Sequence, residues 1–187
     1  SLFMSSYFSK TSRLGRVNTG SVAQRLADTP GVARTILDAA RAARGTPGAD
    51  PRAMSHSWLF TGPPGSGRSL AALDFAAALM CTDSEEPGCG RCEACQAVLD
   101  AKQHTDLVLV DPQEVIIPVD TVREVIGRAA SLPTVAPWRV VIFNNADRLN
   151  NNGANALLKT VEEPPARTVI IMCAPSDAPE DFSQTLR

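Results

Sequence analysis

Four cysteines have the residue type and the spacing of a metal-binding group. Cys81, Cys89, Cys92 and Cys95 follow the pattern C-x7-C-x2-C-x2-C. Four thiolates with two short spacings suit tetrahedral Zn²⁺, and the last pair falls at the start of a predicted helix. Because four sulfurs leave no position for water, the zinc would be structural. An iron–sulfur cluster, two disulfides or free thiols are the alternatives, while Cys173 ends an apolar strand and is expected to be a buried small hydrophobe.

A glycine-rich loop is the second group with possible chemistry. Residues 62–69, GPPGSGRS, fit the phosphate-binding pattern G-x-x-x-x-G-K-[ST] except that Arg68 replaces the lysine. Glycines let backbone N–H groups point at phosphate oxygens, the lysine bridges the β- and γ-phosphates, and the hydroxyl of Ser69 would hold Mg²⁺. A guanidinium is planar and bulky, so we expect ATP or ADP binding to be weakened and hydrolysis to be inefficient. The candidate nucleotide-binding residues are Gly62, Gly65, Ser66, Gly67, Arg68 and Ser69.

The end of a later strand lacks the acidic pair of an ATPase. The apolar run 140–143 is followed by Asn144 and Asn145 instead of Asp-Glu. An amide neither attracts Mg²⁺ as a carboxylate does nor takes a proton from an attacking water. Asp147 lies beyond the pair and is expected to start or cap the segment 147–149. We therefore predict a nucleotide fold kept as a scaffold, with no catalytic residue.

Alternating strands and helices position these two groups. Short apolar runs bounded by turn residues predict buried strands at 58–60, 107–110, 140–143 and 169–172, with a further extended piece at 115–118. Helical patterns cover 69–80, 121–130 and 152–161, and two short helices interrupted by Pro30 and Gly31 precede them. The alternation predicts an α/β fold with a parallel sheet flanked by helices.

Composition narrows the class of protein. The chain has 187 residues, of which 44% are hydrophobic and 20% charged, as in soluble globular proteins. No run approaches 18 apolar residues, so no membrane span is expected. The net charge of −2 argues against a protein that holds nucleic acid by bulk positive charge.

The start of the chain differs from the rest in charge. Residues 1–27 contain no acid, which leaves 14 basic against 20 acidic residues in the remainder. We expect residues 1–20 to be a leader, whether a transit peptide, a cloning remnant or a disordered start, and residues 21–187 to be the folded domain.

Two further motifs carry a family resemblance. Residues 144–149, NNADRL, and 155–165, NALLKTVEEPP, together with the glycine loop and the cysteine insert after its helix, closely resemble the AAA+ subunits of bacterial DNA polymerase III clamp loaders over about Val22–Arg187. Motor subunits of that family keep the lysine and the Asp-Glu pair. The departures at Arg68, Asn144 and Asn145 make the chain resemble the non-hydrolysing stator of the loader.

The resemblance implies an AAA+ P-loop fold with a five-stranded parallel sheet and a small zinc module at 81–95. It implies a bacterial cytoplasmic subunit, not an enzyme by itself, of a DNA-directed DNA polymerase (nucleotidyltransferase) holoenzyme active in DNA replication. The implied partners are gamma/tau-type motor subunits and the delta subunit in a hetero-pentameric ring, and through the ring the sliding clamp and primer-template DNA. A Ser-Arg-Cys arginine-finger motif, a lid and a collar domain would follow Arg187, so the chain would be an N-terminal fragment.

Three other functions fit parts of the sequence. A working motor ATPase would need lysine at position 68 and Asp-Glu at 144 and 145. A small nucleotide kinase would need basic residues and an acidic base for its acceptor, which are not evident. A zinc-dependent nucleic-acid-binding module is weakened by Glu85, Glu86 and Glu93 beside the cysteines.

Overall fold

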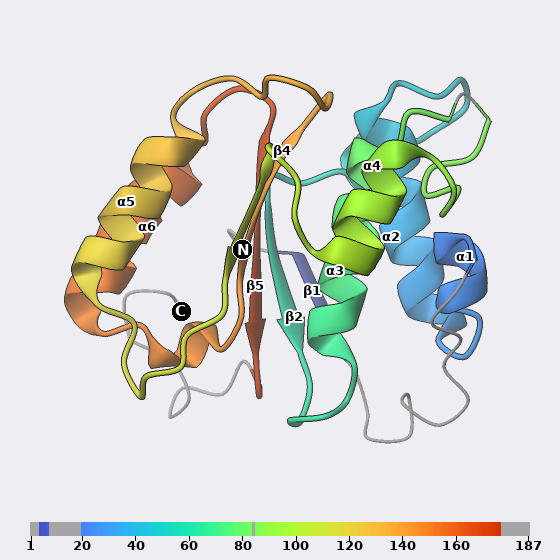
Figure 1. The fold of residues 1–187 in the computed structure, drawn as a ribbon. Coiled ribbons are helices and arrows are strands. Elements are labelled where there is room, and N and C mark those ends of the chain that lie inside the picture. Colours follow the sequence, from blue (N-terminus) through green and yellow to red (C-terminus); the bar gives the residue numbers. More distant parts are fainter. Residues whose placement is uncertain (1–3, 8–19, 84, 177–187) are drawn as a thin grey trace.

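One parallel sheet runs through the centre of the molecule (Figure 1). The computed structural model describes residues 4–7, 20–83 and 85–176. In the order along the sheet, the strands are β1 (Met4–Tyr7), β2 (Ser57–Thr61), β5 (Thr168–Ala174), β4 (Arg139–Phe143) and β3 (Leu107–Val110), and every neighbouring pair is parallel. The prediction of a parallel sheet is confirmed, and β2, β3, β4 and β5 coincide with the four apolar runs predicted to be strands.

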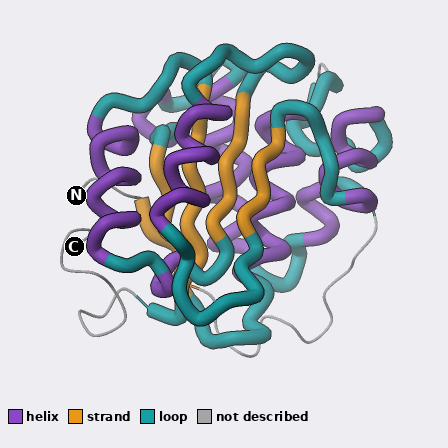
Figure 2. Tube along the Cα trace, turned by 60° about the vertical axis from the view of Figure 1, so that its left-hand side comes forward, coloured by secondary structure: helices purple, strands orange, loops and turns teal. Residues whose placement is uncertain are grey.

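Helices cover both faces of the sheet, as predicted (Figure 2). The helices are α1 (Val22–Arg25), α2 (Pro30–Ala43), α3 (Arg68–Met80), α4 (Glu93–Gln96), α5 (Val119–Ala129) and α6 (Asn151–Glu162). Two short 3₁₀ turns, η2 (Pro51–Ala53) and η4 (Ala146–Arg148), and a π-helical segment after α4, η3 (Ala97–Ala101), complete the elements between the strands. In Figure 1, α5 and α6 lie on one side of the strands and α1 to α4 on the other. Alternate strand residues therefore enter two cores: Val140 and Ile142 pack on the α3 side, and Val141 and Phe143 on the side of α5 and α6.

The expected five-strand count is wrong for residues 21–187. The described part of that range contributes four strands, and the fifth, β1, comes from residues 4–7 inside the expected leader. The extended piece at 115–118 forms a single bridge, from Ile117 to Leu149. Ile117 is fully buried, whereas Val115 and Ile116 are 84% and 53% exposed, so only one residue of this piece anchors it to the core.

Helix α3 is covered by the sheet on one side and by other helices on the other, and nearly all of its residues are apolar. From Ala71 to Met80 every residue is buried. One side packs on the sheet, where Phe75 meets Trp58 edge-on with ring centroids 4.8 Å apart and stacks on Phe60 at 6.1 Å. The other side packs on α1, α2 and α4. Asp74, fully buried in the middle of α3, is paired with Arg25 of α1 at 2.8 Å.

The loop before β4 is fixed by one buried carboxylate. Asp106 accepts hydrogen bonds from the backbone N–H groups of Thr134, Val135 and Ala136 at 2.7 to 2.8 Å, and Arg139 lies 3.5 Å away. Burial works against the charged form, but the three N–H donors and Arg139 hold the pKa of Asp106 below its usual value. Asp106 therefore joins the start of β3 to the entry of β4.

Replacing this carboxylate should destabilise the fold. We expect Asp106→Ala to lower the free energy of unfolding by about 3 kcal/mol at pH 7, because three amides and a buried guanidinium lose their acceptor. Urea unfolding followed by circular dichroism measures the change. The matched control is Asp120→Ala, whose side chain is 93% exposed and should change the value by less than about 0.5 kcal/mol.

The pH dependence has a defined sign. Since the pKa of Asp106 is depressed in the fold, its contribution is fully present above the unfolded pKa of about 4 and is lost as the pH falls through the folded pKa. The difference in stability between wild type and Asp106→Ala should therefore shrink below about pH 4. A difference that stays constant down to pH 2 would contradict this role of the charge.

Candidate metal centre and glycine loop

The two candidate groups lie at opposite ends of α3. Arg68, in the glycine loop, is the first residue of the helix, and Cys81 follows its last residue. Thirteen helical residues separate the two ends by about 20 Å. The groups are therefore two sites joined by one buried helix.

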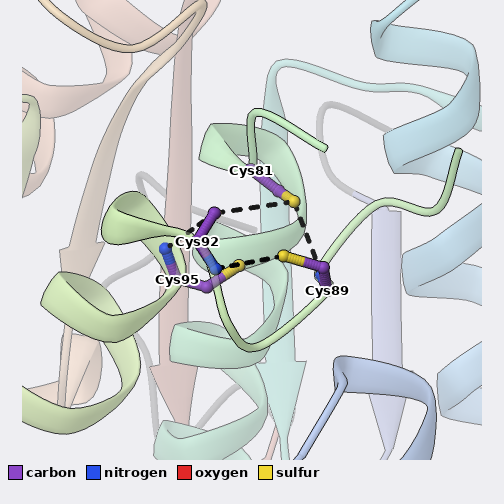
Figure 3. Close-up of side chains that lie close together, drawn as sticks. All are labelled: Cys81, Cys89, Cys92 and Cys95. Carbon is purple, nitrogen blue, oxygen red and sulfur yellow. Dashed lines mark hydrogen bonds between the residues drawn. The ribbon is translucent and has the colours of Figure 1, made fainter. Parts of the chain in front are cut away.

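The four predicted cysteine ligands converge on one point (Figure 3). Cys81 follows α3, Cys89 lies in the loop, Cys92 caps the start of α4 and Cys95 lies within α4, as the sequence predicted for the last pair. All four sulfurs lie within 4.8 Å of one another. All five cysteines are free, and the predicted bystander, Cys173, is fully buried in β5.

Backbone N–H groups point at three of these sulfurs. The N–H of Cys89 donates to Cys81 Sγ at 3.4 Å, that of Cys92 to Cys89 Sγ at 3.3 Å and that of Cys95 to Cys92 Sγ at 3.4 Å. Such donors favour the thiolate over the thiol. The loop therefore already provides the second layer of contacts that a cluster of thiolate ligands needs.

The thiols share their protons unequally. A hydrogen bond from the Cys95 thiol lowers the pKa of Cys81 to about 4, although burial opposes the charge. The same contact, together with burial, raises the pKa of Cys95. The contacts therefore favour the thiolate form at Cys81, and a bound cation would displace the protons of the other thiols.

The sulfur geometry matches a single tetrahedral ion. With metal–sulfur bonds of about 2.3 Å, tetrahedral ligands lie about 3.8 Å apart. Cys92 Sγ and Cys81 Sγ are 3.9 Å apart, well beyond a disulfide bond of about 2.05 Å. A cluster of several irons would hold its cysteine sulfurs farther apart than the 4.8 Å within which these four sulfurs lie. The four side chains could therefore hold one metal ion, with no open position for a reacting molecule.

The cysteine loop is seated on the first two helices. Gly90 has φ +77°, and a Cβ there would lie 2.1 Å from the carbonyl oxygen of Gly20. The N–H of Val22 donates to the Gly88 carbonyl at 2.8 Å. Arg44, at the end of α2, donates to the carbonyls of Cys81 and Asp83 at 3.1 and 2.7 Å, and no local sequence signal points to this role.

The glycine loop forms the predicted turn between β2 and α3. Gly65 and Gly67 have φ +82° and +92°, and the N–H of Ser66 closes the turn on the Pro63 carbonyl at 3.0 Å. A small cavity of about 300 Å³ lies beside the loop. Its lining includes four of the predicted nucleotide-binding residues: Gly65, Gly67, Arg68 and Ser69. Ser66 is buried and its hydroxyl has no partner among the described residues, while Gly62 is not among the lining residues.

Arg68 does not extend freely into this cavity. One guanidinium nitrogen donates to the Gly62 carbonyl, and Nη2 donates to Asn145 Oδ1 at 3.3 Å. The side chain is 6% exposed, and burial lowers the pKa of Arg68, partly offset by the nearby Cys173 and Asp147. An arginine keeps its proton under such conditions, so the charge is held inside the protein.

The end of β4 does not fit a nucleotide–magnesium complex. Asn144 and Asn145 place amides where a magnesium ion requires carboxylates. Asn145 stands at φ +54°, a conformation that asparagine tolerates, and its oxygen is engaged by Arg68. The expectation that Asp147 starts or caps the segment 147–149 is wrong, because Asn145 holds the N-cap position of η4 and Asp147 is the second residue of that turn, with one buried oxygen that has no partner among the described residues. The glycines could cradle a phosphate, while the end of β4 offers two amides in place of carboxylates.

A parallel sheet with a glycine loop between its strand β2 and helix α3 defines an α/β protein of the P-loop type. Residues 48–186 match the family described as DNA polymerase III, delta subunit. The chain belongs to this family.

The relatives that the chain resembles in sequence are also subunits of DNA polymerase III. The chain is 38% identical over 121 residues to DNA polymerase III subunit delta' of Pseudomonas aeruginosa, covering 63% of this chain and 37% of that protein. It is 33% identical to DNA polymerase III subunit tau of Bacillus subtilis, covering 64% of this chain and 21% of the relative. A solved structure of a DNA polymerase III gamma subunit-related protein from Thermotoga maritima has a TM-score of 0.49 and 20% identity, covering 70% of this chain and 37% of that one. The chain thus spans well under half of the relatives it matches.

Within residues 4–7, 20–83 and 85–176, no helix combines the length and the apolar content needed to cross a bilayer.

The cysteine group predicts a metal content that can be measured. We expect the wild-type protein to carry about one zinc ion per chain, and Cys89→Ser to lose most of it and to melt at a lower temperature, because three sulfurs leave the tetrahedron incomplete. Elemental analysis and thermal unfolding with and without a chelator measure both effects.

Cys173→Ala is the matched control, since this buried thiol lies outside the group. It should keep the full metal content. A wild-type protein that contains no metal and melts at the same temperature after chelation would contradict a structural metal.

Proposed function

We propose that the chain is the non-hydrolysing stator, of the delta' type, of a bacterial DNA polymerase III clamp loader. Family membership and the similarity to delta' of Pseudomonas aeruginosa support the complex. The glycine loop is the observation that most supports a stator rather than a motor. Arg68 is bound to Gly62 and Asn145, and the end of β4 has amides at positions 144 and 145 in place of carboxylates.

The partners follow from the same proposal. Motor subunits of the gamma/tau type would use ATP, and the stator would stand beside one of them in a five-subunit ring with the delta subunit. The net charge of −2 suits a subunit that meets primer-template DNA and the sliding clamp through the assembly rather than by itself. We place the complex in the bacterial cytoplasm.

We propose zinc as the ion of the cysteine group, in a purely structural role. Four thiolates form a closed tetrahedral set that zinc prefers. The ion would fasten the loop after α3 to α4, and the residues Gly88, Gly90 and Arg44 would fasten the loop to α1 and α2.

An active motor subunit is the second candidate, favoured by the 33% identity to tau of Bacillus subtilis. Its chemistry requires a lysine that reaches the β- and γ-phosphates and a carboxylate that holds magnesium. Positions 68, 144 and 145 of this chain supply an arginine and two amides, so we propose the stator instead.

The two candidates differ in ATP turnover. The complete protein that carries this chain should hydrolyse ATP at background rate, and Ser69→Ala should leave the ATPase rate of a loader reconstituted with motor subunits unchanged, because this hydroxyl holds no catalytic magnesium. The control replaces the loop lysine of the motor subunits by alanine, which should abolish the rate. Turnover by the isolated protein that disappears in Ser69→Ala would establish the motor function.

A further inference from the structure

The two departures from the ATPase pattern contact each other. Arg68 stands where the loop lysine would be, and Asn145 stands where the second strand-end acid would be. Although 77 residues separate them, Arg68 Nη2 donates to Asn145 Oδ1 at 3.3 Å. Arg68, in the position of the lysine, is therefore hydrogen-bonded to Asn145, in the position of the acid.

The guanidinium links strand ends that are not neighbours. Its other contact is the carbonyl of Gly62, directly after β2, whereas Asn145 follows β4. Strand β5 lies between β2 and β4. The end of β5 is also joined to the loop, since the N–H of Gly62 donates to the Ala174 carbonyl at 3.1 Å. The Arg68 side chain thus connects the ends of β2 and β4, and the backbone of Gly62 adds the end of β5 between them.

An arginine suits this link better than a lysine. Its planar guanidinium carries five N–H donors in fixed directions, so one side chain can serve a backbone carbonyl and an amide oxygen together. A lysine side chain is shorter and carries all its donors on one nitrogen atom, so it spans less distance between two acceptors. The surroundings are dry enough to strengthen both hydrogen bonds, because Arg68 is 6% exposed.

We propose that Arg68 and Asn145 form an internal latch that holds the glycine loop in one conformation without nucleotide. In an active P-loop protein, phosphate oxygens and magnesium bridge the loop and the strand end. In this chain the guanidinium and the amide make that bridge. The latch rests on the proposed stator function. It adds one property to that function: the glycine loop presents the same shape to a neighbouring subunit whether ATP is present or not.

Hydrogen exchange of the loop amides in the complete protein tests the latch. Arg68→Lys, and separately Asn145→Gly, which keeps the positive φ but removes the acceptor, should each speed exchange in residues 62–69 about tenfold, and the double variant should add no more. Asn145→Asp keeps an acceptor at the same place and should retain the slow exchange. Asn144→Ala is the matched control, because the Asn144 oxygen has no partner among the described residues, and it should leave the loop unchanged.

Three results would separate the proposals. Effects of the two single variants that simply multiply in the double variant would overturn the latch and leave the stator proposal standing. Protection of the wild-type loop by millimolar Mg-ATP without turnover would overturn the latch alone. Protection together with turnover would overturn both. If Arg68→Lys fails to fold, Asn145→Gly and Asn145→Asp still test the latch, because only the second keeps an acceptor for Arg68. Equal exchange rates of the loop amides in these two variants would overturn the latch.

Discussion

The whole domain depends on the burial of α3. A parallel sheet exposes apolar residues on both faces and needs helices on each. On one face, α5 and α6 form a single layer, and each has the polar outer side that such a layer requires. On the other face, α3 is buried along nearly its whole length, so it needs a second layer outside it. That layer consists of α1, α2 and α4, and Arg25 of α1 reaches inward to neutralise Asp74 in the middle of α3. The ion pair has little access to water, so the loss of either partner would leave a buried charge.

The outer layer explains why a chain of this size would use a metal. The segment between α3 and α4 is short, and its described residues include Asp83, Glu85 and Glu86 with few apolar side chains. Such a segment cannot bury enough surface to order itself. The proposed structural zinc would contribute on the order of 10 kcal/mol, enough to fix the segment and to hold α4 against α3. The cysteine group thus completes the covering of a helix that hydrophobic burial alone leaves open at one end.

Local patterns predicted a large part of this arrangement. The runs at 107–110 and 140–143 are apolar on both faces, and this property alone marks a central parallel strand. The cysteine spacing predicted that the four sulfurs converge, because all four residues lie within 15 positions of one another. Contacts between distant residues left no such signal. Neither the pairing of residues 4–7 with β2, nor the loop held by Asp106, nor the hydrogen bond between Arg68 and Asn145 can be recognised from a short window. The glycine loop was found, but the orientation of Arg68 required the fold.

The contact between Arg68 and Asn145 also limits how the proposed stator could gain ATPase activity. Changing Arg68 back to lysine would leave the Asn145 amide without its donor, while changing Asn145 to glutamate would place a longer, charged group against a guanidinium that is already engaged. The change at Arg68 gives up a buried contact, and neither change supplies both strand-end carboxylates, because Asn144 would still be an amide. For the proposed non-hydrolysing stator, a gain of ATP hydrolysis would therefore require changes at several of these positions together, and no single substitution among them would be enough.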